Sequence, residues 1–344
     1  MFPLEFPLGV LKRARPDDVV LDPFCGRGTT LFAARALGLV SAGVDVNPVA
    51  VALARAKLVG VGPGLIERRC QELLDGPDPQ QIPRGEFWKL AFGPRTLKDL
   101  CRLREGLLST VDTATDTALR AIVLGAIHGP VNKVVPSYLS NQMPRTYATK
   151  PDAAIRYWRR HELQPAEVDV LEVVAARARR AYGQQPRVMP GSVVLGDAAT
   201  EVRKFRRRFS WVITSPPYYG MRTYVPDQWL RNWFIGGPAS VTYDMSGQLP
   251  QASPKAFVTS LRDVWRACAQ RSTRGARMIV RFGAMPSIKS DPSMLMSASL
   301  DESGWRLTRI ESAGRPHRQR RQAHQMGSVS SPIEEIDCFA TRRA

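Results

Sequence analysis

Cysteine, histidine and long apolar runs are all scarce in this sequence. The five cysteines are odd in number and include no C-x-x-C pair, so we expect reduced thiols and no disulfide framework. The four histidines show no ligand spacing, and we expect no metal site. No stretch approaches the roughly eighteen uncharged apolar residues of a membrane span. The first seven residues lack a basic region ahead of an apolar run, so we expect no secretory signal and a cytoplasmic protein.

Acidic residues are also few relative to basic ones. The 344 residues include 49 Lys and Arg against 31 Asp and Glu, which gives a formal net charge of +18. Such an excess is larger than the solubility of one domain requires, and it favours a polyanionic partner such as nucleic acid. The length is sufficient for one large core with a substantial insert.

A glycine-rich turn follows the first apolar run, at residues 19–30. Val19–Leu21 predicts a strand that ends at Asp22, and Gly26 and Gly28 allow a ligand to approach the backbone. Thr29 and Thr30 open the next helix, where their hydroxyls can cap exposed N–H groups. About twenty residues after the glycines, a second strand ends in Asp45, the place of a ribose-binding acid. No lysine follows the glycines, as a P-loop would need, and Phe24 lies beside an aspartate, so the turn favours a cationic ligand without phosphates, such as S-adenosylmethionine.

A second motif, residues 211–220, reads WVITSPPYYG. Trp211–Ile213 predicts a buried strand that the prolines end, because proline cannot donate to a sheet ladder. Ser215, the Pro216 carbonyl and the Tyr218 ring then lie at a carboxyl end, where α/β sheets bind ligands. Two acceptors beside an aromatic ring suit a flat base that carries an amino group. The alternative is a proline-rich turn whose tyrosine only packs.

Together, DPFCGRGTT at 22–30 and TSPPY at 214–218 resemble the amino-methyltransferases of DNA. These enzymes transfer a methyl group from S-adenosylmethionine to the exocyclic amine of cytosine or adenine. The resemblance implies a catalytic tetrapeptide of Ser215, Pro216, Pro217 and Tyr218. It implies cofactor contacts from Phe6, Asp22, Pro23, Phe24, Cys25, Gly26, Gly28, Thr29, Thr30, Asp45, Val46, Asn47, Asp197, Ala198 and Ser215.

The first residue of the tetrapeptide, Ser215, indicates which base is the target. A serine preceded by threonine is more typical of N4-cytosine enzymes, so we expect N4 of a flipped-out cytosine in double-stranded DNA. Transfer to N6 of adenine, methylation of an RNA base amine and a silent nucleic-acid-binding protein remain as alternatives. Methylation at carbon 5 of cytosine needs a cysteine nucleophile, which follows a proline in the enzymes that carry out this reaction. No Pro-Cys dipeptide occurs in this sequence, so this chemistry is excluded. Cys25 is interpreted as a small packing residue.

The order of elements predicts a Rossmann-like class I methyltransferase fold, a mostly parallel doubly wound sheet with a terminal antiparallel strand and a helical insert. We expect strands at 18–22, 40–45, 187–195, 211–213, 276–283, 305–311 and 333–340. Helices are expected at 29–38, 48–58, 255–270 and 292–303, with a lead-in over 1–16, a linker over 75–83 and helical residues over 86–182. The predicted domains are a cofactor-binding part, 1–78, an insert, 79–185, and a catalytic part, 186–344.

Contacts to DNA are expected from three places. The insert contributes Arg145 and Lys150, and we expect it to carry much of the contact. Tyr219 and Arg222 follow the tetrapeptide, and a basic run at 315–321 contains Arg318, Arg320 and Arg321. The resemblance implies a monomer and a cognate restriction endonuclease as a candidate partner.

Overall fold

The computed structural model of the protein describes residues 2–129, 138–141, 151–220, 226–242, 249, 253–283, 290–314 and 335–343. The chain forms two compact units. Unit 1 comprises 1–58, 187–223 and 245–344, and unit 2 comprises 59–186 and 224–244. The boundaries between the units at 58 and 186 differ from the domain boundaries expected from the sequence, at 78 and 185. The division into cofactor-binding, recognition and catalytic parts stays a prediction.

Unit 1 contains one seven-stranded sheet with the order β3-β2-β1-β4-β5-β7-β6. Its strands are β1 (Val19–Asp22), β2 (Val40–Asp45), β3 (Gly191–Leu195), β4 (Phe209–Thr214), β5 (Ser272–Gly283), β6 (Trp305–Gly314) and β7 (Glu335–Arg342). Neighbours from β3 to β5 are parallel, and β7 is antiparallel to both β5 and β6. This is the predicted Rossmann-like class I methyltransferase fold. The antiparallel strand, β7, lies between β5 and the edge strand β6.

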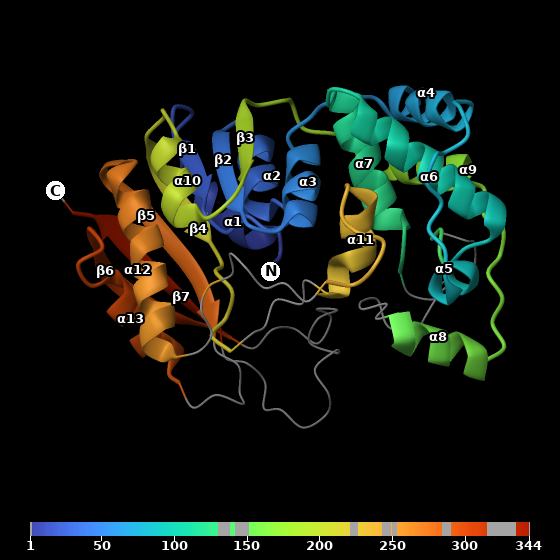
Figure 1. Ribbon diagram of the computed structural model, residues 1–344. Coiled ribbons are helices and arrows are strands. Elements are labelled where there is room, and N and C mark those ends of the chain that lie inside the picture. Colours follow the sequence, from blue (N-terminus) through green and yellow to red (C-terminus); the bar gives the residue numbers. More distant parts are fainter. Residues whose placement is uncertain are drawn as a thin grey trace. The chain divides into compact units, whose positions relative to one another are not determined.

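Helices cover both faces of this sheet (Figure 1). They are α1 (Glu5–Leu11), α2 (Thr29–Ala36), α3 (Pro48–Ala56), α10 (Ala198–Lys204), α12 (Pro254–Gln270) and α13 (Pro292–Leu300). One apolar core includes Phe257 and Trp265 of α12 with Phe282 of β5, and a second includes Leu11 of α1 with Ile213 of β4. Helix α1 was predicted only as a lead-in, because seven residues containing a proline show too little periodicity to mark a helix.

Unit 2 is helical in the part that the structure describes. Its helices are α4 (Pro63–Leu74), α5 (Glu86–Ala91), α6 (Pro94–Ser109), α7 (Ala114–Ala126), α8 (Pro151–Arg160), α9 (Val170–Tyr182), η1 (Pro226–Gln228) and α11 (Trp229–Phe234). The predicted helical insert is confirmed. Helix α11, from beyond the tetrapeptide, joins this unit because Trp229 and Trp233 pack against Trp88 at ring distances of 5.7 and 4.6 Å.

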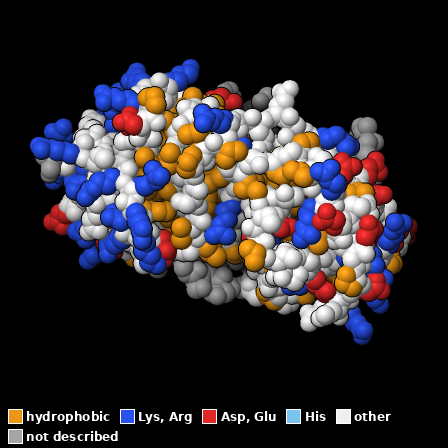
Figure 2. Space-filling model, turned by 90° about the horizontal axis from the view of Figure 1, so that it is seen from above, with side chains coloured by type: hydrophobic (Ala, Val, Ile, Leu, Met, Phe, Trp, Pro, Cys, Tyr) orange, Lys and Arg blue, Asp and Glu red, His pale blue; other side chains and the backbone are white. Residues whose placement is uncertain are grey.

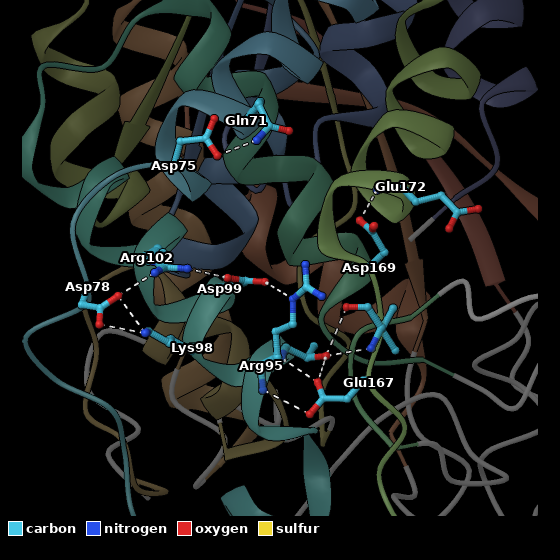
Figure 3. Close-up of polar contacts among 12 residues, drawn as sticks. Gln71, Asp75, Asp78, Arg95, Lys98, Asp99, Arg102, Glu167, Asp169 and Glu172 are labelled. Carbon is cyan, nitrogen blue, oxygen red and sulfur yellow. Dashed lines mark hydrogen bonds and ion pairs between the residues drawn. The ribbon is translucent and has the colours of Figure 1, made fainter.

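Polar contacts order the segments that lie between the helices of unit 2 (Figure 3). Asp78, in the predicted linker, accepts hydrogen bonds from Lys98 at 2.8 Å and Arg102 at 2.6 Å. Glu167 accepts from the backbone N–H groups of Arg95 and Thr96 at 3.2 and 3.0 Å. These contacts satisfy free N–H groups at the start of α6 and hold the linker against the same helix.

The positive charge is concentrated in unit 1. Unit 1 contains 30 of the 49 Lys and Arg residues but 15 of the 31 Asp and Glu residues, so it carries +15 of the net charge of +18. On the face shown in Figure 2, blue side chains are more frequent than red ones over unit 1, beside a broad orange area, whereas blue and red are mixed over unit 2. Any electrostatic attraction for a polyanion would therefore come mainly from unit 1. Among the described residues, no helix is both long and apolar enough to cross a membrane.

Candidate active site

The carboxyl ends of four adjacent parallel strands bring the predicted residues to one edge of the sheet. Asp22 ends β1, Asp45 ends β2, Asp197 follows β3 and Ser215 follows β4. The chain order reverses between β1 and β4, which is the switch point where open α/β sheets bind their ligands.

A direct contact joins the two sequence motifs. The Thr214 hydroxyl donates a 2.6 Å hydrogen bond to Asp22 Oδ1, although the residues lie 192 positions apart. The Thr30 hydroxyl also reaches across, and it donates to the Ile213 carbonyl at 3.4 Å. Ser215, the first residue of the tetrapeptide, therefore follows directly after a side chain that is bonded to Asp22, just before the glycine turn.

The glycine turn has the backbone that its sequence predicts. Gly26 and Gly28 have φ values of 50° and 74°, in the left-handed region that favours glycine. A Cβ on Gly28 would also lie 3.0 Å from the Ala54 backbone. The prediction that Thr29 and Thr30 cap α2 through their hydroxyls is wrong, since Gly28 is the N-cap and no side chain caps this helix. The Thr30 hydroxyl is instead used across the sheet edge.

Asp45 holds the turn from the neighbouring strand. Its carboxylate accepts from the N–H of Gly26 at 2.8 Å and from the N–H of Asn47 at 2.9 Å. Burial raises the pKa of Asp45, although hydrogen bonds from Asn47, Gly26 and Val46 oppose that shift. Asn47 in turn caps α3, where its side chain accepts from Val49 and Ala50. Each carboxylate oxygen can accept a second bond, so Asp45 retains capacity for a ligand hydroxyl.

Beside these acids lies a small apolar surface. Asp197 is exposed and caps α10 by accepting from the Ala199 N–H at 2.8 Å, and Ala198 is buried. Val46 is 39% exposed, and Leu195 is 48% exposed and pairs in register with Asp45. Leu195 was not predicted as a site residue; the signal for it was a leucine placed just before Gly196-Asp197. Val46 and Leu195 together offer apolar contacts suited to a flat ring.

Asp22 is the most deeply buried charge at this edge. It is 2% exposed, and burial raises its pKa to about 6, against hydrogen bonds from Thr214, Thr30 and Phe24 that lower it. Burial also raises the pKa of Cys25, which fits a packing role for this thiol. A buried and a half-buried carboxylate, Asp22 and Asp45, fit a cationic ligand at the glycine turn, because a positive charge would offset part of their desolvation cost.

We expect Asp22→Asn to stabilise the protein increasingly as pH rises. The pKa of Asp22 is raised from 3.8 to about 6, so its stabilising contribution is complete below pH 4 and is lost as pH rises through 6. Asparagine does not titrate and keeps an acceptor oxygen for Thr214. The free energy of unfolding of the variant, minus that of wild type, should therefore grow by up to about 3 kcal/mol from pH 4 to 7. Urea titrations at several pH values measure this difference, and parallel curves would contradict it.

The tetrapeptide leaves its acceptors free but buries its tyrosine. Ser215 is half-buried, and neither its hydroxyl nor the Pro216 carbonyl has a hydrogen-bond partner among the described residues. Pro216 is buried and Pro217 half-buried. Tyr218 is 7% exposed, its ring meets Phe282 edge-on at 6.0 Å, and its hydroxyl donates to Glu335 Oε1 at 2.5 Å. A base could therefore contact only the small exposed part of this ring.

The remaining predicted contacts lie in different places. Phe6 is half-buried, and its ring lies under the guanidinium of Arg281 at 3.8 Å. Phe24 packs edge-on against Trp265, and Pro23 is buried. Tyr219 is 5% exposed against Phe257, which speaks against a DNA contact through its ring. Six predicted DNA contacts lie outside the described residues: Arg145, Lys150, Arg222, Arg318, Arg320 and Arg321. The described residues contain no cluster of three or more potential metal ligands.

Comparison with known proteins gives one family match. Residues 2–56, which contain the glycine turn and Asp45, match the N6/N4 methyltransferase family model described as DNA methylase. No curated protein matches the chain.

Solved structures resemble the chain only distantly. They include a SAM-dependent methyltransferase from Methanosarcina mazei, at 8% identity and a TM-score of 0.36 over 100% of this chain and 98% of that one. An rRNA methylase from Streptococcus thermophilus has 8% identity and a TM-score of 0.37 over 100% and 98%. The rRNA methyltransferase aviRa from Streptomyces viridochromogenes has 14% identity and a TM-score of 0.34 over 99% and 85%. These TM-scores are too low to bear on fold or substrate.

The family match covers the segment that contains the glycine turn, Asp22 and Asp45. The sheet order, the two acids at the glycine turn and the adjacent tetrapeptide agree with that match. The protein is a methyltransferase, and S-adenosylmethionine is its cofactor.

Proposed function

We propose that the protein methylates N4 of cytosine in double-stranded DNA. The observation that carries this proposal is the Thr214–Asp22 hydrogen bond, which holds the TSPPY segment beside the cofactor turn. When bound, S-adenosylmethionine supplies a methyl group on a sulfonium. Asp45 would accept hydrogen bonds from ribose hydroxyls, Asp197 from the adenine amine, and Val46 and Leu195 would contact the adenine faces.

Catalysis by this chain would depend on the two free acceptors of the tetrapeptide. The lone pair of an exocyclic amine is delocalised into the base, so the nitrogen is a poor nucleophile. Ser215 Oγ and the Pro216 carbonyl would accept the two amine hydrogens, which favours a pyramidal nitrogen with a localised lone pair. Positive charge develops on that nitrogen during transfer, and acceptors already in place stabilise it.

A nucleic acid substrate agrees with the charge of the core. Unit 1 carries +15, so a polyanion is attracted to the unit that contains the tetrapeptide. The target base would have to leave the duplex, because its amine cannot reach the sheet edge while it is stacked. The DNA methylase match over 2–56 favours DNA over RNA.

The modified nucleoside tests this proposal most directly. The protein is incubated with isotopically labelled S-adenosylmethionine and either DNA or RNA, and the digested nucleosides are identified by mass spectrometry. We expect labelled N4-methylcytosine from DNA. Labelled N6-methyladenine alone would reject the base assignment, label only in RNA would reject the DNA substrate, and no label in either would reject the function.

We expect the basic run at 315–321 to contact phosphates. Replacing Arg318, Arg320 and Arg321 by glutamine should lower the slope of log affinity against log salt by about three, since each lost phosphate contact lowers it by about one. The pair Arg145→Gln and Lys150→Gln should lower it by about two if the insert also contacts DNA. Fluorescence anisotropy with a labelled duplex at several salt concentrations gives these slopes.

A matched triple substitution controls for the loss of net charge. Arg203, Arg206 and Arg207 are exposed before the first residue of β4, at the edge opposite the tetrapeptide. The structure gives them no acidic partner among the residues it describes. Their replacement by glutamine should leave the slope unchanged. An equal fall in slope for both triples would show that the effect is one of total charge and not of contact.

A further inference from the structure

A buried carboxylate holds the tyrosine of the tetrapeptide. Glu335, the first residue of β7, is 3% exposed, and its Oε1 lies 2.5 Å from the Tyr218 hydroxyl. The two residues are 117 positions apart in the sequence. The contact therefore exists only because β7 inserts into the sheet between β5 and β6.

The register of the sheet explains why Glu335 can reach the site. Glu335 pairs with Gly283 at the end of β5, so no side chain of that partner fills the space beside it. Two residues further along β7, Asp337 pairs with Arg281 and binds its guanidinium through both oxygens at 2.8 and 2.6 Å. Arg281 also interacts electrostatically with Glu335. The carboxylate thus has a cation nearby as well as the tyrosine hydroxyl.

Packing alone does not account for this arrangement. A phenylalanine at 218 would keep the edge-on contact with Phe282, and an apolar residue at 335 would avoid the cost of burying a carboxylate. Replacing buried ionic groups by apolar residues is often neutral or stabilising. The hydroxyl–carboxylate bond fixes the orientation of the Tyr218 ring. Because the Pro216-Pro217 backbone is rigid, the bond also restricts the positions of Ser215 Oγ and the Pro216 carbonyl.

We propose that Glu335 is a positioning residue for methyl transfer: it orients Tyr218 so that Ser215 Oγ and the Pro216 carbonyl face the target amine. This inference rests on the proposed function of the tetrapeptide. Glu335 is 3% exposed and would act through its bond to the Tyr218 hydroxyl. The same carboxylate lies close to Arg281, whose guanidinium covers Phe6, so one cluster supports both the tetrapeptide and a predicted cofactor contact.

The test is a double-mutant cycle between Tyr218→Phe and Glu335→Ala, with kcat and KM measured on DNA. Each single variant should lower kcat about tenfold or more and change KM for S-adenosylmethionine by less than about twofold. The double variant should fall no further than either single one, because both remove the same bond. Glu335→Gln keeps an acceptor oxygen at this position and should recover most of the rate. Glu311→Ala, which removes an exposed carboxylate from the neighbouring strand β6, is the matched control and should behave as wild type.

The results distinguish a failure of the role proposed for Glu335 from a failure of the methyltransferase function on which that role rests. An active wild type with unaffected single variants, or with losses that multiply in the double variant, overturns the role of Glu335 and leaves the function standing. An inactive wild type on DNA and RNA overturns the function first. If Glu335→Ala does not fold, Tyr218→Phe, which removes the hydroxyl and keeps the ring, decides the matter, with Glu335→Gln as the variant that keeps the acceptor. A normal kcat in Tyr218→Phe would then reject the proposal.

Discussion

Ser215→Ala is expected to lower kcat for methyl transfer by about a hundredfold or more, the cost of losing one preorganised group that stabilises developing charge. The effect should be large because the Ser215 hydroxyl has no hydrogen-bond partner among the described residues and is therefore not committed to the fold. A residual rate should remain, since the Pro216 carbonyl is unchanged. The thermal stability should also stay close to that of wild type, because alanine removes one half-buried hydroxyl.

Single-turnover rates at saturating cofactor separate this loss from a binding defect. Ser192→Ala, at an exposed position on β3, provides a serine-to-alanine control away from the carboxyl edge. Its rate should equal that of wild type. A normal rate for Ser215→Ala would show that the serine does not act on the amine, and the backbone carbonyl alone would then have to position it.

Asp45→Ala is expected to weaken the binding of S-adenosylmethionine about a hundredfold or more while DNA binding persists. Charged hydrogen bonds contribute about 1.5–3 kcal/mol each, and a ribose offers two hydroxyls to this carboxylate. Alanine also releases the N–H of Gly26, which Asp45 holds at 2.8 Å, so the glycine turn itself should lose its position. Both effects act on the same ligand and in the same direction.

Calorimetry with S-adenosylmethionine gives the affinity, and a duplex titration by anisotropy confirms that DNA binding survives. Asp17→Ala provides the control, because this exposed aspartate lies before β1, at the opposite end of the strand from the glycine turn. Unchanged affinity in Asp45→Ala would remove Asp45 from the cofactor site. It would then be a residue that only supports the turn.

Several parts of the site follow from local sequence. The strand that ends at Asp22, the left-handed glycines at 26 and 28 and the strand that ends at Thr214 all appear where their patterns predict. Each of these features depends on neighbours within a few residues, through apolar runs, the lack of a Cβ or the constraints of proline. The alternation of strands and helices then predicts a parallel sheet with its ligand edge at the carboxyl ends.

Other features depend on segments that meet only in the folded chain. The sequence places the Tyr218 ring beside two acceptors where a flat base could lie, but the ring packs against Phe282 of β5 and its hydroxyl bonds Glu335 of β7. Helix α11 follows the tetrapeptide in the sequence yet packs with Trp88 of α5. The predicted cap at Thr30 is replaced by a bond to the neighbouring strand.

The physical reason is the range of the interactions. Sequence alone determined the strand ends, the turn and the residue types at them, because these depend on backbone conformation over a few residues. Tertiary structure alone decided which side chains the hydroxyls of Thr214 and Tyr218 bond, at separations of 192 and 117 residues. Those partners are set by the order of strands in the sheet, and no local pattern encodes the distance between a hydroxyl and a carboxylate on another strand.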